Sequence, residues 1–161
     1  MTSLRSNMLR FITITALFFS LVVFTGCGNG EAPSDDDDTD ETEMTEWEQE
    51  HGFGPITEPV QISDAIDEDL AALGHDVFEL RCESCHRIDS ELVGPAMRGV
   101  FQGRSPEWIM NFTLNPRENI QDHPLGQSLM QQYLVEMPYQ GVSEEEARAI
   151  VEYLRAEVEE S

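Results

Sequence analysis

The sequence predicts a small all-α domain over residues 63–161, with four or so helices. Four segments of this stretch carry apolar residues at the three- and four-residue spacing of one helix face. Residue types that favour helix starts precede these segments. No segment alternates polar and apolar residues over the length of a strand. A domain of this size is small for a self-sufficient core, so we expect a buried group to supply part of the apolar volume.

The first predicted helix begins near Asp64 or Asp67, because either side chain can cap it. It ends at a cysteine motif that begins at residue 82. One face is predicted to pack into the core, because its apolar residues recur at helical spacing. These residues are Leu70, Leu73, Val77 and Phe78.

The second predicted helix has Ser105 as its N-cap and Pro106 in its first turn. It ends at Asn115, because a residue that precedes a proline disfavours helix. Its apolar face consists of Trp108, Ile109 and Phe112.

The third predicted helix starts at Pro124. The fourth opens with Ser143 and Glu146, which have the spacing of a capping box. An apolar stripe predicts that the fourth helix packs along its whole length. The stripe consists of Ala147, Ile150, Val151, Leu154 and Val158.

Residues 1–26 are predicted to be a targeting segment rather than part of the fold. Arg5 and Arg10 provide a positive start, and residues 11–25 form an apolar run that is short for a bilayer span. Residues 24–27 (Phe-Thr-Gly-Cys) resemble the lipobox of bacterial lipoproteins. That resemblance implies that Cys27 becomes the acylated N-terminus and holds the protein at a membrane. The alternative is an ordinary signal peptide with an incidental cysteine.

Residues 27–62 are predicted to form an acidic flexible linker followed by an extended segment. Residues 28–50 include the run Asp35–Asp38 and have almost no apolar residues. Such a segment cannot bury enough surface to offset its chain entropy, so we expect it to be disordered. Residues 51–62 contain glycine and proline, which favour irregular or extended backbone.

The chain that begins at Cys27 is strongly acidic. It has seven arginines, no lysine and 32 aspartates and glutamates, so its formal net charge is −25, against −23 for the whole sequence. This charge excludes nucleic acid as a partner, because phosphates would repel it. The acidity either maintains solubility or provides a face that binds a basic partner.

The strongest functional motif is C-x-x-C-H, formed by Cys82, Cys85 and His86. Two thiols at this spacing project from one face of a helical turn, where each can add to one vinyl group of a single porphyrin. The following histidine then lies under the ring and can bind its iron. Zinc would need about four ligands, a redox dithiol would need a βαβ context, and a disulfide gives the histidine no role. The motif therefore predicts one covalent haem c.

Four motifs, in order, resemble those of class I cytochromes c. Gly74 and Phe78 precede C-x-x-C-H at the spacing of that family's first helix, and Gly94-Pro95 follows at the place of its proximal proline. Met137-Pro138 resembles its sixth-ligand loop, and residues 149–155 resemble its last helix. The resemblance covers about residues 66–158 and implies the class I cytochrome c fold.

The resemblance also assigns roles around the haem. It implies that the Pro95 carbonyl accepts a hydrogen bond from the ring nitrogen of His86 that does not bind iron. It implies that Arg104, with Trp108, contacts the haem propionates, although residues 100–104 have one residue more than the family's pattern. The alternative is a solvated arginine and a core tryptophan.

The sixth iron ligand is predicted to be Met137. It precedes a proline in a loop between the third and fourth helices, which holds it extended and can direct its thioether to the iron. Met110 and Met130 lie in helical segments, where methionine usually packs in the core. Met97 follows the Gly-Pro loop closely, so we expect it on the proximal side. His123 is the main alternative, although it also stands at a helix start and can act as a cap.

A histidine and a methionine on the iron favour an electron carrier rather than an enzyme, because no coordination site stays open. We expect redox proteins as donor and acceptor, such as a respiratory complex or a terminal reductase, and no small-molecule substrate. We expect the protein in the bacterial cell envelope, lipid-anchored and facing the periplasm. The alternatives are a haem subunit of a larger respiratory or reductase complex, and a gas-binding sensor or enzyme with an open distal site.

Overall fold

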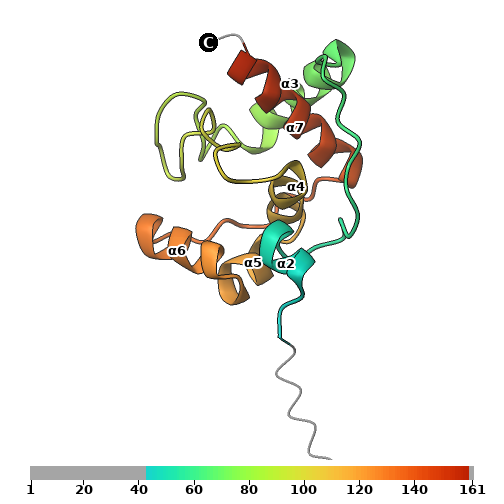
Figure 1. Ribbon diagram of the computed structural model, residues 1–161. Helices are drawn as coiled ribbons and strands as arrows, with labels where there is room; N and C mark the ends of the chain where they lie inside the picture. The colour runs from blue at the N-terminus through green and yellow to red at the C-terminus, as the bar shows by residue number, and fades with distance from the viewer. Residues whose placement is uncertain (1–42, 160–161) are drawn as a thin grey trace, which may run out of the picture. The chain divides into compact units, whose positions relative to one another are not determined.

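The structure is a computed structural model that describes residues 43–159 (Figure 1). Residues 43–159 belong to one compact unit. The predicted signal peptide at residues 1–26, the acylation of Cys27 and the acidic run Asp35–Asp38 lie outside the described residues. No helix among residues 43–159 is both long enough and apolar enough to cross a membrane.

Helices are the only regular elements in the described part, which confirms the predicted all-α class. In chain order they are α2 (Glu46–His51), α3 (Glu68–Arg81), α4 (Pro106–Leu114), α5 (Pro116–Asp122), α6 (Pro124–Tyr133) and α7 (Glu144–Glu159). Figure 1 shows α3 beside α7, α5 beside α6, and α4 between these two pairs. Long loops connect α3 to α4 and α6 to α7.

The predicted helix starts are confirmed. Asp67 accepts from the backbone N–H of Leu70 (3.0 Å) at the start of α3. Ser105 caps α4 with Pro106 in its first turn. At the start of α7, the backbone N–H of Ser143 donates to the Glu146 carboxylate (2.7 Å) and that of Glu146 donates to the serine hydroxyl (3.1 Å). These signals are local, so the sequence shows them directly.

Helices α3 and α7 cross at Gly74. A Cβ atom there would lie 2.0 Å from the Ala149 carbonyl oxygen, so only glycine permits this approach. The ring of Phe78 meets that of Tyr153 at 5.4 Å. Close packing at the crossing turns two predicted core residues outward: Leu73 and Val158 are exposed (39% and 38%). That part of the prediction was wrong, because the contact face is narrower than the apolar stripe.

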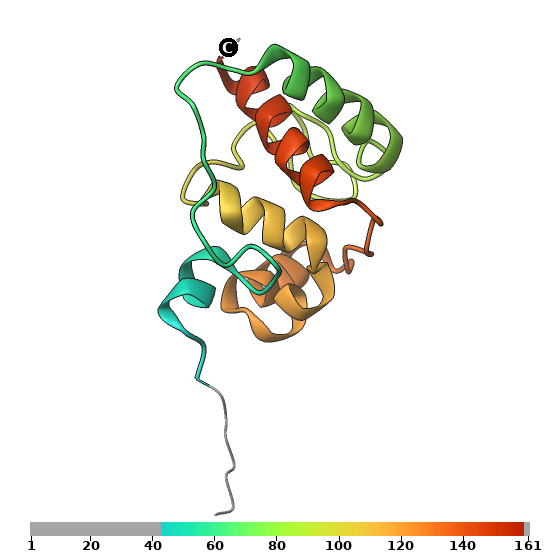
Figure 2. The same cartoon turned by 90° about the vertical axis from the view of Figure 1, so that its right-hand side faces the viewer.

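The described chain is already packed before residue 63, where the domain was predicted to start. Residues 46–51 form α2, with Thr45 and Glu48 as its capping box. The side chain of Asn111 in α4 binds the backbone of Ile56, and that of Asn119 in α5 binds the backbone of Phe53. Figure 2 shows the chain from α2 to α3 running past α4 towards α7. We name residues 45–62 the N-terminal strap. Residues 52–62 contain no helix or strand, as expected for an irregular or extended stretch, and they pack against α4 and α5.

Helix α5 was not predicted. Helix α4 ends at Leu114 as expected, but Pro116 begins a new helix at once instead of a loop. Proline suits this first position, because its missing N–H would have no partner there. Gly126 of α6 lets α5 approach closely, since a Cβ atom there would lie 1.8 Å from the Asn119 carbonyl oxygen.

Candidate functional site

A large apolar cavity lies between the α3–α7 pair and the α5–α6 pair. It encloses about 1400 Å³ of space, part of it open to solvent. All seven residues that the sequence predicted for cofactor binding line it: Cys82, Cys85, His86, Pro95, Arg104, Trp108 and Met137. These residues come from the end of α3, the loop after it, α4 and the loop before α7. The fold therefore brings together side chains that are up to 55 residues apart in sequence.

The two cysteines lie on one turn that continues α3. The backbone N–H groups of Cys85 and His86 both donate to the carbonyl of Cys82 (3.0 and 2.9 Å), which keeps the thiols close to one cavity wall. Burial, with a smaller contribution from Cys85, raises the pKa of the Cys82 thiol to about 11. Both thiols are free of disulfide bonds. No group of three or more potential metal-binding side chains exists within residues 43–159.

The imidazole of His86 is held in one orientation. Its Nδ1 donates to the Pro95 carbonyl at 3.0 Å, as the resemblance implied. The backbone N–H groups of Val93 and Gly94 donate to the Cys85 carbonyl (3.1 and 2.9 Å), which folds the loop back against the ring. A Cβ atom at Gly94 would lie 2.5 Å from the imidazole Cε1, so glycine is needed here. Nε2 is then the ring nitrogen left to bind iron.

The other candidate ligands are placed differently from Met137. His123 is buried outside the cavity lining. Its Nδ1 accepts from the Leu125 N–H (3.1 Å) and so caps α6. Its Nε2 lies 3.2 Å from the Gln49 carbonyl and so contacts the N-terminal strap. Met110 packs in a core cluster with α7. Met97 and Met130 do line the cavity, but Met97 packs against the α3–α7 core and Met130 belongs to α6.

Two polar side chains at the α4 side of the cavity fit the acidic edge of a haem. Trp108 Nε1 is buried and has no hydrogen-bond partner among the described residues. The Arg104 guanidinium lies 5.1 Å from the centre of the tryptophan ring and lines the same cavity. A buried N–H without a partner is costly, and a haem propionate would satisfy it. An apolar cavity with a paired thiol turn, an oriented imidazole and these two donors therefore fits a covalent haem.

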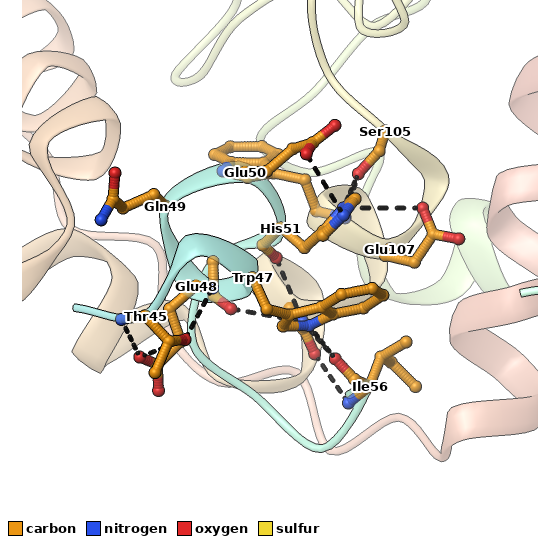
Figure 3. A network of polar contacts seen from close by, with 12 residues as sticks. Thr45, Trp47, Glu48, Gln49, Glu50, His51, Ile56, Ser105 and Glu107 are labelled. Atoms are coloured by element: carbon orange, nitrogen blue, oxygen red, sulfur yellow. Dashed lines mark hydrogen bonds and ion pairs between the residues drawn. The ribbon is translucent and has the colours of Figure 1, made fainter. Parts of the chain in front are cut away.

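The N-terminal strap supports this edge of the cavity through a polar network that the sequence did not reveal (Figure 3). His51 Nδ1 lies 2.7 Å from Ser105 Oγ and 3.8 Å from the Glu107 carboxylate. Ser105 Oγ also accepts from the backbone N–H of Trp108 (3.0 Å). The Trp47 ring meets the imidazole of His51 at 4.0 Å, and its Nε1 donates to the Ile56 carbonyl (3.0 Å). The strap thus holds the first turn of α4.

Comparisons with known proteins agree with this geometry. A sequence model of the family described as Cytochrome c matches residues 71–156, which is more than half of the chain. The solved structure of a cytochrome c from Rhodothermus marinus is 41% identical, with a TM-score of 0.67, and covers 71% of this chain and 97% of its own. An engineered cytochrome c from the same organism, bound to a carbene intermediate, is 42% identical with a TM-score of 0.63, covering 70% and 96%. No curated protein matches the chain.

Proposed function

Because this chain belongs to the cytochrome c family and is a haem-based electron carrier with one covalently attached haem c, we propose that it is a membrane-anchored one-electron carrier of a respiratory chain. The observation that carries the proposal is the shared cavity. Cys82, Cys85, an oriented His86 and Met137 all line it. We propose that His86 and Met137 are the axial ligands, and that the protein has no enzymatic activity.

Each residue has a physical task in this proposal. When bound, the haem supplies an iron that alternates between the ferrous and ferric states. The cysteines hold it covalently, and the Pro95 carbonyl fixes the ring of His86 and makes it a stronger donor. The thioether of Met137 favours the ferrous state. The apolar walls exclude water, which keeps charge reorganisation small.

The lipobox-like end of the first 27 residues supports membrane anchoring. Acylation of Cys27 would place the domain at the bacterial cell envelope, facing the periplasm. The acidic sequence between Cys27 and the N-terminal strap would then act as a tether that lets the domain move between partners.

The proposed partners are redox proteins, one donor and one acceptor. The loop around Met137 presents exposed apolar side chains, Leu134 (78%), Val135 (50%) and Tyr139 (64%). Glu136 is the only charged residue between positions 134 and 143. This supports an apolar contact at the cavity mouth, for which electron transfer should depend little on salt. A steep decline of the rate with rising ionic strength would instead indicate an acidic docking face and a basic partner.

A spectrum with and without carbon monoxide tests the proposed function. The reduced-minus-oxidised spectrum should be that of a haem c with two thioether links, and the ferrous protein should bind carbon monoxide only slowly. Rapid binding would show an open iron and favour the gas-binding alternative. Stable co-purification with a reductase or oxidase would favour a fixed subunit over a mobile carrier.

A further inference from the structure

We propose that Arg81 is a positioning residue for Met137: it ties the helix that holds the haem to the loop that supplies the sixth ligand. Arg81 is the last residue of α3 and directly precedes Cys82. Its Nη1 donates to the carbonyl of Gln140, three residues after Met137, at 2.8 Å. The side chain is partly buried and lines the cavity. The inference rests on the proposed ligation by Met137.

The loop between α6 and α7 depends on this contact, because its own backbone makes few hydrogen bonds. The backbone N–H of Leu134 closes the end of α6. From residue 135 to residue 142, no backbone-to-backbone hydrogen bond occurs in the described structure. The Gln140 side chain donates to the Pro138 carbonyl (2.7 Å), but that contact stays within the loop. Two anchors remain, the buried side chain of Val142 and the guanidinium of Arg81.

The two anchors differ in what they can fix. Val142 packs into the α3–α7 core, and apolar contact is not directional. A charged N–H···O=C bond is directional and about twice as strong as a neutral one. Gly141, next to the bonded carbonyl, has φ +67°, and a Cβ atom there would lie 3.6 Å from the Arg81 guanidinium. The loop therefore turns at the point where Arg81 binds it.

In the described part of the chain, the Arg81 side chain makes no hydrogen bond other than the one to Gln140. No carboxylate between residues 43 and 159 forms an ion pair with it within 4.0 Å. A residue that only stabilised the helix end would be expected to bond within its own turn. Arg81 instead spans 59 residues to Gln140.

Arg87 provides a matched control. It lies on the other side of the C-x-x-C-H motif, and its Nη1 also donates to a backbone carbonyl, that of Glu83, at 2.7 Å. That bond stays within the motif's own turn and does not reach the Met137 loop. Arg87 also lies 3.9 Å from the Glu83 carboxylate, an exposed ion pair that contributes little. Arg81→Gln and Arg87→Gln thus each remove one positive charge and one bond to a backbone carbonyl, and we expect only the first to release the loop.

The test measures how often Met137 leaves the iron in the ferric holoprotein. Imidazole is titrated while the near-infrared sulfur-to-iron band is followed, because the apparent dissociation constant falls as the open fraction rises. Loss of a charged hydrogen bond can shift such an equilibrium by about 10- to 150-fold. We expect Arg81→Gln to tighten imidazole binding by up to that factor. Arg81→Lys, which keeps one charged donor, should fall between it and the wild type, and Arg87→Gln should stay within twofold.

Limited proteolysis gives a second readout that does not depend on the iron ligand. A glutamate-specific protease can cut the loop at Glu136. Cleavage there, located by mass spectrometry, should become faster in Arg81→Gln and not in Arg87→Gln. Equal imidazole affinity in both variants, or unchanged cleavage at Glu136 in Arg81→Gln, would overturn the inference. A wild-type protein without the near-infrared band would instead refute the proposed ligation by Met137, while cleavage would still report whether Arg81 holds the loop.

Discussion

The side-chain amide of Asn111 binds the N-terminal strap to α4, and its removal should lower the free energy of unfolding. Asn111 is fully buried. Its Oδ1 accepts from the Ile56 N–H (2.9 Å), and its Nδ2 donates to the carbonyls of His51 (3.0 Å) and Ile56 (2.9 Å). Asn111→Ala removes these three bonds and a longer one from Nδ2 to the Gly52 carbonyl (3.4 Å). The Ile56 carbonyl keeps a bond from Trp47, but the Ile56 N–H has no other partner among the described residues.

The expected loss follows from these contacts. One buried N–H without a partner costs about 1–3 kcal/mol, and the other lost bonds add roughly 0.5–1.5 kcal/mol each. The cavity left beside Gly54, which packs against the Asn111 amide, adds to this loss. Alanine's better helix propensity offsets at most about 0.7 kcal/mol. We therefore expect the free energy of unfolding of the holoprotein to fall by about 2–4 kcal/mol.

Urea unfolding measures this loss, and limited proteolysis locates it. The strap contains no lysine or arginine but four glutamates, so a glutamate-specific protease is the suitable probe. Cleavage in the strap should become faster in Asn111→Ala. Asn115→Ala is the control, because its amide bonds to Glu118 in α5 rather than to the strap. A loss below about 1 kcal/mol with unchanged cleavage would refute the reasoning, since it would mean that these bonds contribute nothing net.

Three further predictions concern the ligand, the anchor and pH. Met137→Ala should abolish the near-infrared sulfur-to-iron band and allow rapid carbon monoxide binding; an unchanged spectrum would identify another ligand. Cys27→Ser should move the protein from membranes to the soluble envelope fraction with its haem spectrum intact; wild-type protein found fully soluble would contradict this. Burial alone would raise the pKa of Glu152, but hydrogen bonds from the Asp67 N–H and the Arg148 guanidinium lower it below its usual value. Its contribution to stability is present above the unfolded pKa and is lost as pH falls through the folded one, so Glu152→Gln should flatten the acid side of a stability-versus-pH curve.

Local signals in the sequence were enough for much of the fold and for the cavity residues. The caps at Asp67, Ser105 and Ser143 each act within one helical turn, and so does C-x-x-C-H. Each can therefore be recognised from a few neighbouring residues. Helix α2 had such a pattern too, because Thr45 and Glu48 have capping-box spacing. It was missed because the acidic composition around it predicted disorder.

The remaining features depend on contacts between distant parts of the chain. The amides of Asn111 and Asn119 bind backbone groups 55 and 66 residues earlier, and Arg81 binds a carbonyl 59 residues later. The residues next to an asparagine in a helix, or to an arginine at a helix end, do not indicate which distant group it will bind. Composition and periodicity therefore could not predict the strap or the tie to the loop.

These distant polar contacts hold two different walls of one cavity. The strap fixes the start of α4, which carries Trp108 next to Arg104, while Arg81 fixes the loop that carries Met137. Apolar packing keeps both walls near the haem but does not select one geometry, because it is not directional. An electron carrier needs one fixed geometry, because its iron must keep the same ligands in both oxidation states. In a domain this small, a few directional bonds at the walls of the cavity fix that geometry.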